Sequence, residues 1–153
     1  MKKLFPVLLL IPVTVCGLWS VCVGGSGYSG DDVNTFMCGL QVSLFEGGSI
    51  LFQLQFSGQD VDVIRMDTRA VYDGVYSYWF NSGENAGVLN IAPAANSSSA
   101  CTMANVNIAF DDAGRNAGVI TSGTITETGL DLDPAIDGVP RSMAGWTCRV
   151  HRD

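Results

Sequence analysis

The five residues Phe52-Gln53-Leu54-Gln55-Phe56 alternate large apolar side chains with amides, and this alternation decides the fold class. Successive side chains of a β-strand point to opposite faces of a sheet, so such a segment buries one face and leaves the other in water. The same period of two recurs over residues 36–44, 105–110 and 146–151, and no sustained helical period follows residue 31. The sequence therefore predicts half-buried antiparallel strands.

Turn-forming residues separate these apolar runs. Glu46-Gly47-Gly48-Ser49 and Ser57-Gly58-Gln59-Asp60 predict the first two turns, and Asp73-Gly74 predicts a tight hairpin. The predicted strands cover residues 36–44, 52–56, 61–66, 70–72, 75–80, 88–92, 103–110, 119–126 and 145–151. Short strands at this spacing predict an all-β domain, either an antiparallel β-sandwich or a small β-barrel of about eight strands.

The N-terminus has the layout of an export segment, because Lys2 and Lys3 precede an uncharged apolar run from Leu4 to Val23. We predict a signal peptide or membrane-targeting segment over residues 1–20, a Gly/Ser-rich flexible spacer over 21–32 and a single all-β domain over 33–153. Three fates of the first segment stay open: cleavage, acylation of a cysteine as in a bacterial lipoprotein, or retention as a membrane anchor. The chain is expected in the periplasm or cell envelope or outside the cell, with membrane contact only through this segment.

The cysteines predict disulfide bonds, because exported domains usually pair their thiols. Cys38 and Cys148 fall on the expected core faces of the first and last strands, which favours a bridge between them and leaves Cys22 to pair with Cys101. Four cysteines allow three pairings, so the other two stay open.

The charge balance excludes a nucleic-acid binder, because 8 basic against 15 acidic residues leave a net charge of −7. Catalytic triads need a histidine held in a site without water, whereas the single histidine, His151, is expected to face outward near the C-terminus. We therefore expect no catalytic residue. A small carboxylate-dependent hydrolase is the weakest alternative, and its acids would come from Glu46, Asp60, Asp62, Glu84 and Glu127.

The aromatic group Tyr72, Tyr76, Tyr78 and Trp79 is the candidate binding site. Tyr76 and Tyr78 share one face of their strand, and Trp79 projects from the other. Aromatic rings anchor protein partners and stack on sugars, because they bury a large area at low entropic cost. These observations predict a non-catalytic binding module for a protein or a glycan. The alternatives are that one aromatic row belongs to the core, and that the chain is a structural subunit of a surface assembly.

One loop is a candidate calcium site, since Asp131, Asp133 and Asp137 supply three carboxylates and calcium prefers oxygen ligands. The alternative is an ordinary solvated turn. No other cofactor is expected.

Overall fold

The computed structural model describes residues 39–81, 86–109 and 118–152. The predicted export segment and spacer, together with Cys22 and Cys38, lie outside the described residues. In the part that is described there is no helix that is long and apolar enough to cross a membrane.

The described residues form nine antiparallel strands, which belong to one sheet. They are β1 (Leu40–Glu46), β2 (Ser49–Ser57), β3 (Asp60–Arg65), β4 (Val71–Asn81), β5 (Ala86–Pro93), β6 (Ala100–Asn107), β7 (Thr124–Thr128), β8 (Arg141–Ser142) and β9 (Thr147–Arg152). Their order across the sheet is β8-β7-β6-β5-β4-β3-β2-β1-β9. The all-β prediction is confirmed. The sandwich alternative is wrong, because one continuous sheet takes the place of two packed ones.

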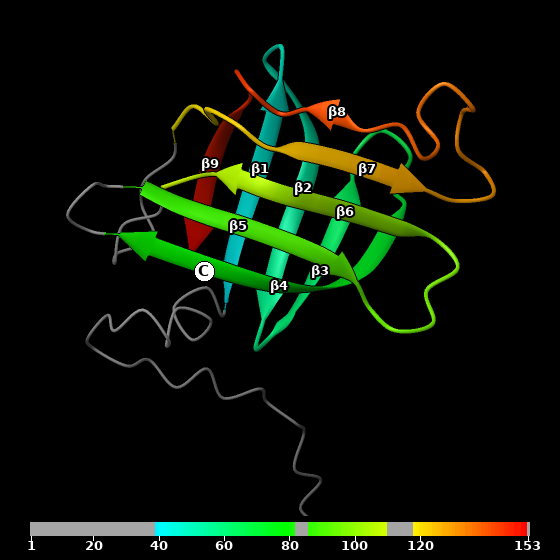
Figure 1. Cartoon of the computed structure of the whole chain (residues 1–153), viewed down its shortest axis with the longest axis horizontal. Helices are drawn as coiled ribbons and strands as arrows, with labels where there is room; N and C mark the ends of the chain where they lie inside the picture. The colour runs from blue at the N-terminus through cyan, green and yellow to red at the C-terminus, as the bar shows by residue number, and fades with distance from the viewer. Residues whose placement is uncertain (1–38, 82–85, 110–117, 153) are drawn as a thin grey trace, which may run out of the picture.

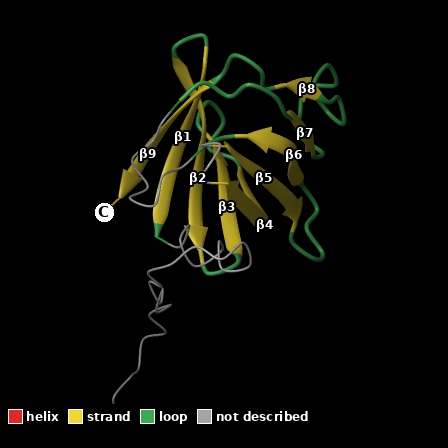
Figure 2. Cartoon of the chain, turned by 60° about the vertical axis from the view of Figure 1, so that its left-hand side comes forward, coloured by secondary structure: helices red, strands yellow, loops and turns green. Residues whose placement is uncertain are grey.

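The sheet curls into a half-barrel (Figure 1). Figure 2 shows β9, β1, β2 and β3 side by side, with β4 to β8 turning away from them. Backbone hydrogen bonds of residues 118–123 link the β9 side of the sheet to the β6 side. The amide of Ile120 donates to the carbonyl of Trp146 beside β9 at 2.7 Å, and the amide of Asn107 on β6 donates to the carbonyl of Ser122 at 2.9 Å.

The concave face of the sheet holds the core. Alternate residues of β1 and β2 are buried there as the period of two predicts, and they are Leu40, Val42, Leu44, Phe52, Leu54 and Phe56. The ring of Phe52 stacks on Trp146 at 6.2 Å between centroids. Burying each large apolar side chain contributes about 1.5–3 kcal/mol, so this face supplies most of the driving force for folding.

The Asp73-Gly74 hairpin prediction is wrong, because β4 continues through both residues. Gly74 pairs with Val61 of β3 on one side and with Pro93 of β5 on the other. A Cβ atom at Gly74 would lie 3.0 Å from the carbonyl oxygen of Ala92 and 3.0 Å from a methyl group of Ile91. This glycine therefore serves close packing inside a strand and forms no turn.

Two other features differ from the prediction. The strand expected over 119–126 begins only at Thr124, and the short β8 was not expected at all. The turns at 46–49 and 57–60 are confirmed, with positive φ at Gly47, Gly48 and Gly58.

Candidate ligand-binding face

The structure separates the four aromatic candidates. Tyr72, Tyr76 and Tyr78 are buried on the concave face, whereas Trp79 is 48% exposed on the convex face. The tyrosine hydroxyls donate hydrogen bonds inside the protein, to Glu127, to the carbonyl of Gly58 and to the carbonyl of Ile108. Burial raises the pKa of Tyr72 and Tyr76 well above the ordinary range. Trp79 is thus the member of the group that solvent and ligands reach.

The convex face around Trp79 carries hydroxyl and amide side chains. Across the sheet, Trp79 lies opposite Val88 of β5, and Val88 lies opposite Asn107 of β6. Two residues before Trp79 on β4, Ser77 lies opposite Asn90 of β5. Neighbouring strands are about 4.8 Å apart, so Trp79 and Asn107 are about 10 Å apart. We call these five residues the Trp79 face.

Polar groups of the Trp79 face remain available to a ligand. Asn90 Oδ1 accepts a hydrogen bond from the backbone amide of Asn105 at 2.8 Å, which orients the Asn90 side chain. Within the described chain, the Asn90 NH2 group, the Ser77 hydroxyl and the Asn107 amide make no side-chain hydrogen bond. These groups therefore offer donors and acceptors beside an exposed indole ring.

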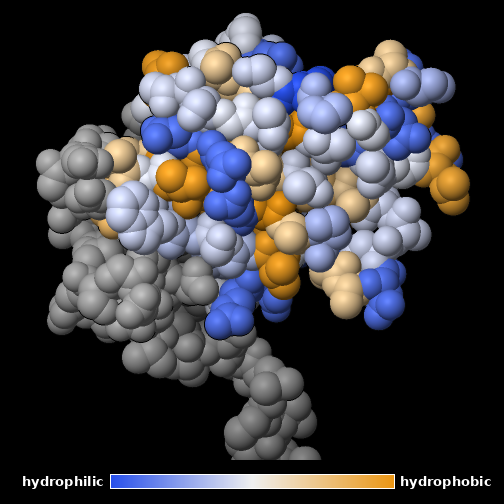
Figure 3. Space-filling view, in the orientation of Figure 1, coloured by the Kyte–Doolittle hydropathy of each residue, from blue (hydrophilic) through white to orange (hydrophobic). Residues whose placement is uncertain are grey.

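The convex side of β4 continues from Trp79 toward the start of the strand. Val75 and Val71 are 42% and 53% exposed, and Asp73 lies between them. Figure 3 shows apolar side chains set among polar ones over β4 and β5. Asp73 lies directly opposite Asp62 of β3, so two carboxylates are neighbours across the two strands.

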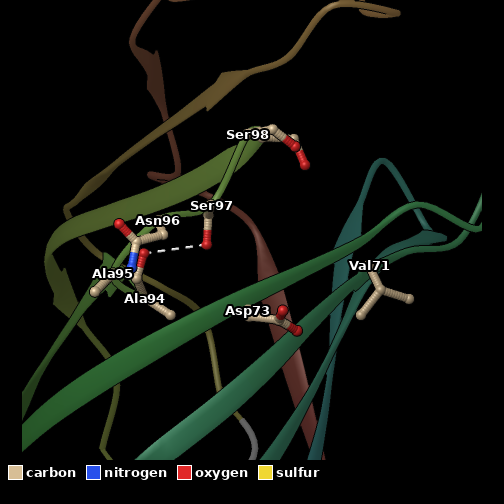
Figure 4. A pocket seen from close by; sticks show the side chains of 8 residues that line it. Val71, Asp73, Ala94, Ala95, Asn96, Ser97 and Ser98 are labelled. Atoms are coloured by element: carbon tan, nitrogen blue, oxygen red, sulfur yellow. Dashed lines mark hydrogen bonds between the residues drawn. The ribbon is translucent and has the colours of Figure 1, made fainter.

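A hollow of about 270 Å³ lies at this end of β4. Val71, Asp73 and the loop of residues 94–99 line it (Figure 4). The loop is held in place by two hydrogen bonds, one from the Ala94 amide to the Asp73 carbonyl at 2.9 Å and one from Ser97 Oγ to the Ala94 carbonyl at 3.1 Å. No hydrogen bond or ion pair joins the Asp73 carboxylate to another residue of the described chain.

A buried charge cluster lies on the other, concave side of the sheet. Glu127 is 1% exposed, and its Oε2 accepts hydrogen bonds from Arg65 Nη1 at 2.7 Å and from Arg141 Nη2 at 2.8 Å. Tyr72 Oη donates to Glu127 Oε1 at 3.1 Å. Arg65 also contacts Asp67, and this pairing raises the pKa of the arginine and lowers that of the Asp67 carboxyl. The cluster ties β3 and β4 to β7 and β8.

Sequence reasoning missed this cluster, although a signal for it exists. Glu127 follows Ile125 by two residues, and Arg65 follows Val63 by two residues. The period of two therefore places both charged residues on the buried face. Of the candidate acids that the structure describes, Glu127 is the buried one, whereas Glu46, Asp60 and Asp62 are exposed and Glu84 lies outside the described residues. His151 is exposed, as expected.

Cys101 and Cys148 are both buried, and no disulfide bond joins them to each other. Cys101 lies opposite Glu127 in the β6–β7 register, and burial, followed by the charge of Glu127, raises its pKa. Burial also raises the pKa of Cys148. Because the expected partners Cys38 and Cys22 lie outside the described residues, the two bridges stay predictions.

The carboxylates of the candidate calcium loop form local turn contacts. Asp133 Oδ1 accepts from the Ala135 amide at 2.9 Å, and Asp137 Oδ1 accepts from the Gly129 amide at 3.2 Å. Asp131 is exposed. Among residues 39–81, 86–109 and 118–152, no group of three acidic, histidine or cysteine residues is placed to hold a metal ion. Calcium binding by this loop stays a prediction.

No protein-family model, no curated protein and no solved structure matches the chain.

Proposed function

We propose that this protein is an exported, non-catalytic β-domain that binds a glycan on the Trp79 face. The observation that carries this proposal is the position of Trp79, a large indole ring 48% exposed on a central strand of the sheet. Strands on both sides hold β4 in register, so the ring is presented from a rigid support. Exposed aromatic residues on such a support are favourable anchors for a ligand, since little entropy is lost when they bind.

The residues beside Trp79 favour a glycan over a protein partner. A sugar ring has an apolar face that stacks on an indole and a rim of hydroxyl groups that need donors and acceptors. Ser77, Asn90 and Asn107 supply neutral groups of this kind within about 10 Å of the indole. The net charge of −7 further favours a neutral or basic ligand over a polyanion.

Export rests on the sequence of the first 23 residues. Lys2 and Lys3 followed by the apolar run Leu4 to Val23 support delivery to the periplasm, the cell envelope or the outside of the cell. Intact-mass spectrometry of the native protein tests this directly, because the mass reports cleavage, acylation or retention of the segment. An unmodified full-length chain recovered from the cytoplasm would contradict export.

Binding is tested by screening a panel of neutral and basic oligosaccharides and measuring the affinity of each binder by calorimetry. Trp79→Ala is expected to weaken binding about tenfold or more, since removing a central aromatic anchor costs at least about 1.4 kcal/mol. Val139→Ala is the matched control, because Val139 is a similarly exposed apolar residue (44%) that belongs neither to the Trp79 face nor to the hollow. We expect this control to bind a short neutral oligosaccharide with unchanged affinity.

Two results would refute the proposal. One is a panel without any binder, and the other is a Trp79→Ala variant with wild-type affinity. Loss of binding by misfolding is recognised from urea unfolding, which both substitutions should leave unchanged because both side chains are exposed.

A further inference from the structure

The hollow at the start of β4 has the dimensions and lining of a site for one small polar unit. Its volume of about 270 Å³ is just below the range of about 300–1,000 Å³ that drug-sized ligands occupy. The residues that line it include Asp73 on the sheet and Ser97, Ser98 and Ser99 on the loop. In Figure 4 the side chains of Asp73 and Ser97 lie on opposite sides of the open space.

The hollow and the Trp79 face belong to one continuous surface. Residues 71, 73, 75, 77 and 79 of β4 all point to the convex side, with buried residues between them. Each residue advances a strand by about 3.4 Å, so Asp73 and Trp79 are about 20 Å apart. An extended chain of a few sugar units therefore reaches from the indole to the hollow.

The electrostatics of the hollow favour a cation. The Asp73 carboxylate has no cationic partner in the described chain, and it lies opposite the Asp62 carboxylate in the β3–β4 register. Like charges at opposite positions destabilise a strand pair, and a bound positive charge relieves that repulsion. The serine hydroxyls on the other side accept and donate hydrogen bonds but carry no charge that would compete.

We propose that this hollow is the end subsite of the glycan-binding surface and that it takes a positively charged amino-sugar unit. The ammonium group lies against the Asp73 carboxylate, and the ring hydroxyls bond to the serines of the loop. This inference rests on the proposed function, because Trp79 holds the other end of the same ligand.

The test compares two probes with the same sugar backbone, a four-unit glucosamine oligomer and its fully N-acetylated counterpart, in which an uncharged acetamido group replaces each ammonium group. Binding of the full-length protein is measured by calorimetry at about pH 6, where the amines are protonated. Wild type is expected to bind the charged oligomer roughly two- to fivefold more tightly, the effect of one solvent-exposed ion pair. Asp73→Asn is expected to abolish this preference and to leave the affinity for the acetylated oligomer unchanged.

Asp131→Asn is the matched control, because it removes the same charge from an exposed loop outside the hollow. It should keep the preference, which separates a local contact from the general attraction between an acidic protein and a cation. Equal affinity of wild type for the two oligomers would overturn the subsite. Loss of the preference in Asp131→Asn would also overturn it.

The two proposals fail in distinguishable ways. If Trp79→Ala leaves both affinities unchanged, the glycan-binding function itself is refuted. If Trp79→Ala weakens both while wild type shows no preference, only the amino-sugar subsite is refuted. A lysine tetrapeptide serves as a third probe. Its binding at the strength of the glucosamine oligomer, with the same loss in Asp73→Asn, would show that the hollow selects charge alone and would overturn the assignment to a sugar.

Discussion

Replacing Glu127 by glutamine should destabilise the protein more than any other conservative change at a charged residue. The Glu127 carboxylate is 1% exposed and accepts hydrogen bonds from Arg65, Arg141 and Tyr72. Glutamine has nearly the same size, so the substitution leaves no cavity. It removes the negative charge that balances two guanidinium groups at one end of the core.

The size of this destabilisation depends on how far other groups balance the charges of Arg65 and Arg141 once Glu127 is neutral. Removing one partner of a buried ion pair costs about 3–5 kcal/mol. Arg65 keeps its contacts to Asp67 at 2.7 and 3.0 Å, and the Arg141 side chain is 25% exposed and regains water. Both facts place the expected loss at the lower end of the range, about 3 kcal/mol.

Urea unfolding followed by tryptophan fluorescence measures this loss. With a slope of about 2 kcal/mol per molar, the midpoint should fall by about 1.5 M while the slope stays the same. Asp67→Asn is the control. Its side chain is 50% exposed, so the change should cost less than about 1 kcal/mol. A Glu127→Gln midpoint within about 0.3 M of wild type would refute the view that this cluster holds the two parts of the sheet together.

Three further predictions concern single positions. Gly87→Ala should lower the free energy of unfolding by about 1–3 kcal/mol, because the added Cβ would collide with a buried tyrosine hydroxyl and a backbone carbonyl. Gly118→Ala is the control and should unfold in urea like wild type, because no atom lies within 4 Å of the added Cβ. Iodoacetamide at pH 8 should modify Cys101 and Cys148 in denaturant with reductant but not in the native protein, since burial raises both pKa values. Labelling of the native protein would contradict this burial, and resistance to labelling in denaturant without reductant would show that the two cysteines are bridged. Arg65 lowers the pKa of the Asp67 carboxyl, so the ionised carboxyl stabilises the fold above its ordinary pKa of 3.8, and this contribution is lost as the pH falls through the lowered pKa. Asp67→Asn should therefore reduce the loss of stability at acid pH, measured by urea unfolding at a series of pH values. A pH profile identical to that of wild type would contradict the pairing.

Local patterning predicts much of the architecture. The period of two assigns Leu54 to the core and places Tyr78 and Trp79 on opposite faces of their strand, and the structure confirms both assignments. Such assignments succeed because the alternation of strand side chains depends on the backbone alone. They also direct attention to Trp79, although the pattern does not say which of its two aromatic rows is exposed.

A local pattern does not predict features that depend on residues far apart in the sequence. Asp73-Gly74 is a favourable hairpin dipeptide, yet packing against Ile91 on the neighbouring strand keeps it inside β4. Glu127 meets Arg65 across 62 positions of the chain, and no local rule pairs them. The choice between one curled sheet and two packed sheets has the same origin, because it depends on β9 pairing with β1.

The strand order also sets the sequence of events by which the chain assembles. Strands β1 to β8 each lie beside the strand that precedes or follows them, so their hairpins close over short stretches of chain. β9 meets β1 only across nearly the whole domain, and loop-closure entropy makes that contact late. Until β9 docks, β1 presents an unpaired edge to other molecules. A nascent chain still lacking its last strand is therefore the form most prone to aggregate, and the rate of its completion governs how much protein reaches the folded state.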